Sequence, residues 1–270
     1  MFFYTLKMDL KRMFQSWKFY IALLGISILT FMNVWPEVIA SEYNCSIYYL
    51  VNARGGISAF LLATTVLVVF PFGLSYREDV KNNYINNIRS RINVKVYGWS
   101  HGLTTALGAF LVVFLGYTLC FIILSFKIQI ISTEEIELIQ RYYFEQGLTV
   151  YEKVLYTGQE FFYFILVFAI EALGYSFMAM LALMLSVKIE NSFVLLSTPI
   201  LFYYGSNFVL SLADLPAIFH WQNIMFSGGC FREISSLWVS MLCVLLYFGG
   251  LICLECFLFS SWMERRRING

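Results

Sequence analysis

Charged residues are scarce in this chain. Only 13% of its 270 residues are charged, whereas soluble domains contain about a quarter. Hydrophobic residues make up 60% of the sequence, and the mean hydropathy is +0.72. Water is therefore not the solvent for most of the surface, and the composition predicts an integral membrane protein. The net charge of +1 says nothing about partners.

Motifs for catalysis and nucleotide binding are also missing. The sequence contains no G-x-x-x-x-G-K-[ST] loop, no H-E-x-x-H motif and no G-x-S-x-G nucleophile elbow. Its histidines are His101 and His220, and no Cys/His cluster has the spacing of metal ligands. We therefore expect no enzymatic activity, no catalytic residue and no metal site in this chain.

The six cysteines do not suggest a disulfide framework. Four lie in apolar segments, where thiols act as small apolar fillers: Cys120, Cys243, Cys253 and Cys256. The spacing of the last two is that of a redox motif, but the usual sequence context is missing. Cys45 and Cys230 fall in two different loops, and a bridge between them is possible but not required.

Long apolar runs dominate the sequence instead. A helix needs about 20 residues to cross a bilayer core, and in lipid its backbone groups must be satisfied within the segment. We expect six transmembrane helices, at residues 19–35, 57–75, 103–126, 161–187, 192–212 and 237–262. The predicted fold is an all-α polytopic membrane protein with a single transmembrane domain, residues 1–270.

The positions of Lys and Arg predict the orientation. Thirteen of the eighteen lie before the first span, after the second, after the fourth or after the last. The positive-inside rule makes these segments cytoplasmic, both termini included, and leaves the acidic loop 127–160 outside. A cleaved signal peptide would end near Ala40. Its apolar region would be longer than usual, so we expect a retained helix.

Two segments outside the spans are also apolar in part. In residues 1–18, apolar side chains recur at helical spacing: Phe3, Leu6, Leu10, Met13, Phe14 and Trp17. This pattern predicts an amphipathic helix in the headgroup plane, and the alternative is a cytoplasmic extension of the first span. Residues 213–236 are apolar but broken by Pro216 and Gly228, which favours interfacial or re-entrant helices on the outer side.

The segment 76–100, after the second span, is basic and rich in asparagine. Within it, Val80, Tyr84, Ile88 and Ile92 recur every four residues, with Ile85 alongside. Asparagine is a poor helix former, so packing must hold such a helix. The positive-inside bias explains the charges but not the apolar stripe. The stripe indicates docking, either against the ends of the spans or against a partner protein.

Polar groups within the predicted spans need partners or water. Glu171 lies near the middle of the fourth span, and Glu255 lies in the cytoplasmic half of the sixth. Each either lines a translocation pathway or is a neutral acid hydrogen-bonded inside the bundle. Tyr203, Ser206 and Asn207 of the fifth span are further candidates for the pathway. Hydroxyl groups that bond across helices are an equally common use of such residues.

The whole chain resembles the membrane subunit of an ABC-2 type ABC transporter, the type V exporter architecture. Three segments carry the resemblance: "FFYTLKMDLKRMFQSWKFY", "FGLSYREDVKNNYINNIRSRINVKVYGWSHG" and the last span with "ERRRING". The resemblance implies that the 76–100 region contains a coupling helix that contacts a separate ATPase subunit. The implied contact residues are Tyr76, Arg77, Glu78, Asp79, Val80, Lys81, Tyr84, Ile85, Ile88, Arg89 and Arg91.

The resemblance also implies partners and a location. Two ATPase subunits would bind ATP and Mg²⁺, this chain would hold no cofactor, and a second permease chain would meet it near the fifth span. The complex would lie in the plasma membrane of a bacterium and export an amphipathic solute such as a peptide, lipid or drug. Nucleic acid is not an expected partner. The alternative is a non-transport protein, either a membrane enzyme using Glu171 or His220 or an assembly or sensor partner.

Overall fold

The computed structural model describes residues 1–42, 45–53, 59–85, 92–144, 149–155, 158–213, 215–234 and 236–268, and all regular structure within them is helical. Five helices are long and apolar enough to cross a membrane: α2 (Trp17–Ala40), α7 (Val94–Ser125), α10 (Glu160–Leu185), α11 (Ser192–Leu212) and α13 (Leu237–Ile268). This arrangement confirms the prediction of an all-helical, multi-pass membrane protein.

The remaining described helices are shorter and lie before or between these five. Helix α1 (Phe2–Gln15) precedes α2. Between α2 and α7 lie α3 (Ile47–Ala53), α4 (Ala59–Leu67) and α5 (Ser75–Lys81). Between α7 and α10 lie α8 (Thr133–Phe144) and α9 (Glu152–Leu155). Between α11 and α13 lie η1 (Ala217–Phe219), α12 (Trp221–Ser227) and η2 (Gly229–Glu233).

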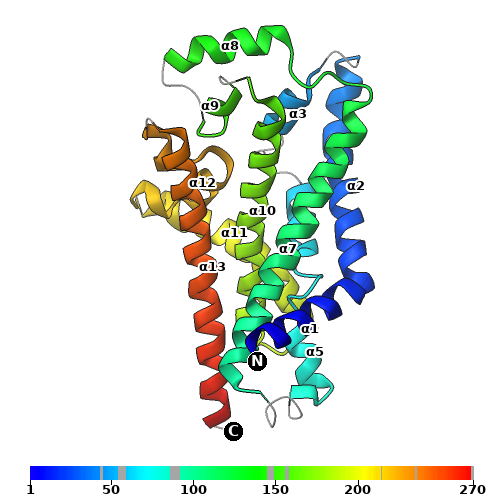
Figure 1. Ribbon diagram of the computed structural model, residues 1–270, viewed down its shortest axis with the longest axis vertical. Helices are drawn as coiled ribbons and strands as arrows, with labels where there is room; N and C mark the ends of the chain where they lie inside the picture. Colours follow the sequence, from blue (N-terminus) through cyan, green and yellow to red (C-terminus); the bar gives the residue numbers. More distant parts are fainter. Residues whose placement is uncertain are drawn as a thin grey trace.

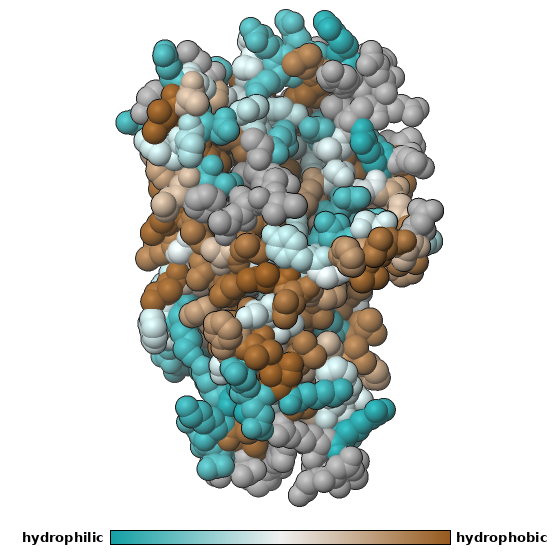
Figure 2. Space-filling model, turned by 180° about the vertical axis from the view of Figure 1, so that it is seen from behind, coloured by the Kyte–Doolittle hydropathy of each residue, from teal (hydrophilic) through white to brown (hydrophobic). Residues whose placement is uncertain are grey.

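Helices α2, α7, α10 and α13 run along the long axis of the molecule, with α7 and α10 at the centre (Figure 1). Helix α7 packs against α1, α2, α10 and α13. Both termini lie at one end together with α1 and α5, whereas α3, α8 and α9 lie at the other end. Figure 2 shows hydrophobic residues gathered across the middle of one face, with hydrophilic residues at both ends. This distribution matches a bilayer core flanked by two polar surfaces.

The second predicted span, 57–75, is not one continuous helix. Helix α4 has nine residues and ends at Leu67, and turns follow as far as Leu74. Proline lacks an N–H group, and its ring clashes with the carbonyl of the residue four positions earlier. Since that residue is Leu67 for Pro71, the helix ends where the proline requires. Residues 54–58 lie outside the described part of the chain, so the six-span count stays a prediction.

The N-terminal helix points a mixed face at the protein and an aromatic face away from it. Ser16, in extended backbone, separates α1 from α2. Phe3 and Phe14 of α1 are exposed, while Thr5, Asp9 and Met13 are buried. The outward aromatic face is consistent with the predicted position in the headgroup plane. Met13, predicted for the lipid-facing stripe, instead packs inward against α7.

Glycines in α7 allow close approach to its neighbours. A Cβ atom at Gly98 would lie 3.0 Å from Ser260 Cα of α13, and one at Gly102 would lie 2.6 Å from Cys256 Sγ. These two glycines are four residues apart, on one helix face, a spacing that lets helices in membranes pack closely. A Cβ atom at Gly108 would lie 2.6 Å from Met13 Sδ of α1. Helix α7 is therefore the element on which α1 and α13 converge.

The loop region 213–236 contains three short helices in the described residues, interrupted near Pro216 and at Gly228, whose φ of 81° suits glycine. Side chains at α9 hold this region in place. The Tyr151 hydroxyl donates to the Ile224 carbonyl at 2.8 Å, and Lys153 Nζ donates to the carbonyls of Arg232 at 2.7 Å and Ile234 at 3.0 Å. Whether these helices enter the membrane stays a prediction.

Replacing Lys153 with methionine should loosen residues 229–234. Methionine keeps most of the apolar stem but removes two charge-assisted hydrogen bonds, each worth about 1.5–3 kcal/mol. We expect faster amide hydrogen exchange in η2 with unchanged exchange in α7 and α10. Lys127→Met, at an exposed position just after the end of α7, is the matched control. Equal exchange in the two variants would contradict the assigned role of Lys153.

Candidate functional site: a buried charge cluster beside α5

Helix α5 contains the first half of the predicted coupling residues, and several of them face the protein. Tyr76 is 1% exposed, and its ring meets Phe259 of α13 edge-on at 5.5 Å. The Arg77 guanidinium lies 3.6 Å from the Glu190 carboxylate, beyond the end of α10. Val80 is half-buried against the core. These contacts fix α5 to the ends of two spans.

The other charged residues of α5 pair with the N-terminal segment. Glu78 forms an ion pair with Lys18 at the start of α2, and both side chains are partly exposed. Asp79 is 1% exposed and forms an ion pair with Arg12 of α1, at a distance of 2.6 Å. Lys81 is exposed at the end of the helix. Helix α5 is thus held by α1 and α2 as well as by α13.

Asp79 belongs to a buried cluster that joins three helices. Its Oδ2 accepts a hydrogen bond of 2.7 Å from the Tyr97 hydroxyl of α7 and lies 3.2 Å from His101 Nε2, also of α7. The other ring nitrogen of His101, Nδ1, lies 3.0 Å from Asp9 Oδ2 of α1. The Ser100 hydroxyl also donates to Asp9. His101 is fully buried between two carboxylates that come from two different helices.

The charges in this cluster explain why Asp79 and Arg12 stay ionised although they are buried or partly buried. Burial alone would raise the pKa of Asp79, but hydrogen bonds from His101 and Tyr97 and the charge of Arg12 hold that pKa below its usual range. Burial alone would lower the pKa of Arg12, but the charge and hydrogen bond of Asp79 raise it. The two groups are therefore charged throughout the physiological pH range and stabilise each other.

The predicted docking stripe does not lie on a single helix. Helix α5 ends at Lys81, and Asn83 has a φ of 55°, in the left-handed region that asparagine tolerates better than most residues. Beyond this break, Tyr84 is 40% exposed and Ile85 is buried. The Arg12 guanidinium lies 5.9 Å from the Tyr84 ring centre. Ile88, Arg89 and Arg91, the remaining predicted contact residues, lie outside the described residues.

The structure brings some of the predicted pathway residues together. Glu171 is buried in α10, and both Glu171 and Tyr203 of α11 interact electrostatically with Tyr175. Ser206 accepts a hydrogen bond of 3.1 Å from Trp221 Nε1 of α12. Asn207 faces outward and is exposed. The hydrogen bond from Trp221 supports a role for Ser206 in joining helices α11 and α12. Glu171 and Tyr203 lie in one region of the bundle.

Glu255, the second intramembrane acid, is 4% exposed, and neither carboxylate oxygen has a hydrogen-bond partner among the described residues. It lies next to Cys256, the residue that packs against Gly102 of α7. An ionised carboxylate would be costly here, so the position suits the neutral acid.

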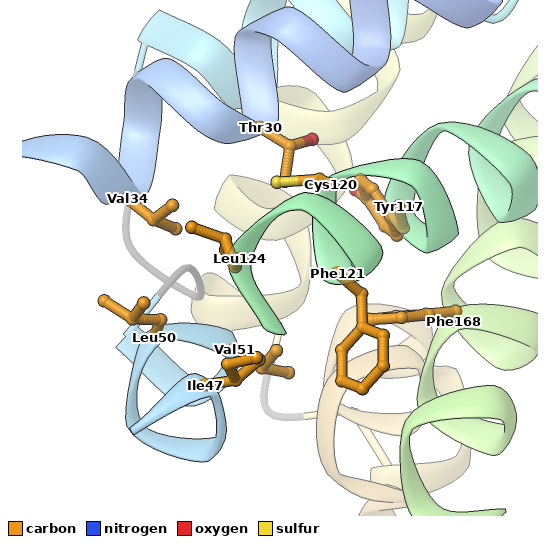
Figure 3. A pocket seen from close by; sticks show the side chains of 10 residues that line it. All are labelled: Thr30, Val34, Ile47, Leu50, Val51, Tyr117, Cys120, Phe121, Leu124 and Phe168. Carbon is orange, nitrogen blue, oxygen red and sulfur yellow. The ribbon is translucent and has the colours of Figure 1, made fainter. Parts of the chain in front are cut away.

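An apolar pocket lies in the half of the bundle that faces away from the termini. Side chains from α2, α3, α7 and α10 point toward one another around it (Figure 3). Its volume of about 20 Å³ has room for roughly one water molecule. The Thr30 hydroxyl at its edge already donates to the Ile26 carbonyl at 2.8 Å. The pocket is too small to hold a transported solute.

The cluster around His101 was missed by the sequence analysis. Asp9 was not assigned any role, and His101 was noted only as one of two histidines. One signal was available: Thr5, Asp9 and Met13 follow one another every four residues, which places an acid on one face of a helix with two other buried residues. None of the six cysteines, all of which lie in the described part of the chain, forms a disulfide, so the possible bridge between Cys45 and Cys230 is not present.

No protein-family model, curated protein or solved structure matches this chain.

Proposed function

We propose that this chain is the permease subunit of an ATP-driven exporter of the ABC-2 type. It acts with two copies of a separate ATPase subunit and a second permease chain, and it moves an amphipathic solute out of a bacterial cell. ATP and Mg²⁺ bind to the ATPase, and this chain performs no hydrolysis. Both termini, α1 and α5 lie on the cytoplasmic side of the plasma membrane.

The observation that carries the proposal is the anchoring of α5. A short helix between two apolar segments is tied to α7 through Tyr97 and His101, and to α13 through Tyr76. Its last residue, Lys81, and the residues directly after it, 82–84, are exposed. A soluble partner that bound these residues would therefore push or pull on two membrane helices at once. A passive membrane anchor has no need of such a connection.

The surface of α11 supports a second permease chain as partner. Only 17% of its apolar window is buried, compared with 72% for α10. Phe193, Leu201, Phe208 and Leu212 are all at least 66% exposed. Lipid or another copy of an apolar helix must cover this face. A second chain seated here would enclose a pathway between two bundles, and the apolar pocket among α2, α3, α7 and α10 is too small to serve as one.

One structural observation bears on the enzyme alternative, and it argues against an enzyme. Two carboxylates and a histidine from different helices do meet, which the sequence analysis did not find. Asp9, Asp79 and His101 are all at most 3% exposed, and both ring nitrogens of His101 are occupied by carboxylate oxygens. Catalytic groups must reach a substrate. This enclosed cluster holds helices together, so it does not favour an enzyme.

Purification of the tagged chain from its native membranes in a mild detergent tests the proposal. We expect a soluble ATP-binding subunit to co-purify. Tyr84→Asp, which places a charge on the exposed surface after α5, should reduce its recovery at least about tenfold because an unpaired charge at an interface costs more than 1.4 kcal/mol. Tyr49→Asp, at a residue of similar exposure near the opposite end, is the matched control.

The two possible failures have different meanings. If no ATP-binding subunit accompanies the wild-type chain under several gentle conditions, the exporter proposal is wrong. If the subunit co-purifies equally with wild type, Tyr84→Asp and Tyr49→Asp, the proposed contact surface is wrong and the ATPase binds elsewhere.

A further inference from the structure

The His101 cluster is electrically balanced. The Tyr97 hydroxyl lies 3.0 Å from His101 Nε2 and donates its proton to Asp79 at 2.7 Å. An ionised carboxylate only accepts hydrogen bonds, so a ring that satisfies both Asp9 and Asp79 donates from both of its nitrogens. That form of the ring is the positively charged imidazolium. With Arg12 on Asp79, the cluster contains two negative and two positive groups. Loss of any one charge would leave an uncompensated charge in an enclosed site, which is strongly unfavourable.

His101 also lies where several segments meet. Its ring centre is 4.1 Å from that of Tyr97 and 5.0 Å from that of Phe72, which lies in the turn between α4 and α5. Asp9 comes from α1, and Asp79 comes from α5. The residues between α5 and α7 leave α5 at Lys81 and turn at Asn83. The short, direct connection from α5 to α7 is therefore the side-chain contact through Tyr97 and His101.

We infer that His101 is a positioning residue whose charge locks α1 and α5 onto the span α7, so that a displacement of α5 reaches the membrane through the balanced cluster. The lock itself depends only on the charges of the cluster. The transmission step rests on the proposed function, because a partner must move α5. Tyr76 against Phe259 provides the second contact, to α13. Helices α1, α5 and the adjoining half of α7 then move as one body.

The first test uses the purified chain alone and a rescue by charge balance. His101→Gln leaves two carboxylates with one cation, and backbone amides of α1 should exchange hydrogen roughly a hundredfold faster because the buried site is left charged. Asp9→Asn combined with His101→Gln restores neutrality, with Arg12 on Asp79, and should bring exchange back to within about threefold of wild type. Lys11→Gln, an exposed charge on α1, is the matched control.

Two outcomes overturn the lock. One is wild-type exchange of α1 in His101→Gln, and the other is equally fast exchange in the single and the double variant. A purely steric role for the ring predicts the second outcome, since the double variant lacks the ring as well. If His101→Gln yields no folded protein, Arg12→Gln removes the same charge from the partly exposed edge of the cluster. It should show the same loss, and Asp9→Asn should restore it.

The second test uses the complex with its ATPase and measures transmission. Addition of ATP and vanadate should change amide exchange in α7 of the wild type, should not do so in His101→Gln, and should do so again in the double variant. An unchanged response in His101→Gln overturns the transmission step. If the chain has no ATPase partner, the proposed function and the transmission step fail together. The exchange of α1 in the chain alone then still decides on the lock.

Discussion

Replacement of Asp79 with alanine should lower the stability of the chain by about 3 kcal/mol and its melting temperature by about 6–12 °C. The change leaves Arg12, Tyr97 and His101 facing a site that has lost its central acceptor. Removal of one partner of a buried ion pair typically costs about 3–5 kcal/mol. The lower end applies because the Arg12 side chain is 39% exposed and water compensates part of its charge.

The neighbouring residue provides the matched control. Glu78→Gln removes an acid of the same helix whose ion pair with Lys18 is partly solvated, and such pairs contribute about 0–1 kcal/mol. Thermal unfolding of purified wild type and both variants, in one detergent, measures the difference. Equal melting temperatures for Asp79→Ala and Glu78→Gln would show that the cluster does not stabilise the chain.

The stabilisation by Asp79 has a predictable pH dependence. Its pKa is lower in the folded chain than in the unfolded one, so the unfolded state takes up a proton first as the pH falls. The contribution is complete well above the unfolded value of about 3.9 and is lost as the pH falls through the lower folded value. Stability measured from pH 7 down to pH 3 should therefore decline in wild type more than in Asp79→Ala.

Gly98→Leu should have an effect of similar size, by separation of α7 from α13. A Cβ atom at this position meets the backbone of Ser260 at 3.0 Å, and backbone cannot move away as a flexible side chain can. Overpacking of a core costs about 1–3 kcal/mol or more, and we expect the upper part of that range. The variant should elute as aggregate or unfold at least about 6 °C lower.

Gly250→Leu is the control for this substitution. Gly250 lies in α13, and an added Cβ would meet nothing within 4 Å. At that open position the change should stay within about 0.5 kcal/mol. Gly98→Ala should fall between the two leucine variants. If Gly98→Leu is as stable as Gly250→Leu, the close packing of α7 on α13 is not correct.

The sequence predicted the membrane class and the positions of the apolar helices because both depend on local composition. A continuous apolar run must satisfy its own backbone in lipid, so α2, α7, α10, α11 and α13 could be located from the sequence. Their ends were less accurate, since α7 begins at Val94, nine residues before the predicted start at residue 103. The early end of α4 was also a local matter. Pro71 requires α4 to end at Leu67. The hydropathy of residues 57–75 did not indicate this end, because the residues on both sides of the helix break are apolar.

The stripe of Val80, Tyr84 and Ile88 shows the limit of periodicity. A repeat of four residues is read as a single helix, yet the described part contains a helix that ends at Lys81 and a left-handed residue at Asn83. Asparagine-rich sequence was recognised as unfavourable for a helix. Its tolerance of the left-handed conformation, which allows the break, was the more relevant property.

By itself the sequence determined a multi-pass helical membrane protein with polar ends and a separate amphipathic segment before its first span. Only the tertiary structure decided that Asp9 and Asp79 meet on His101, 92 and 22 residues away along the chain. Periodicity assigns a side chain to a face of its own helix, but it carries no information on which distant helix that face will meet. Burial of opposite charges in one enclosed site then selects the arrangement in which every ionised group has a partner.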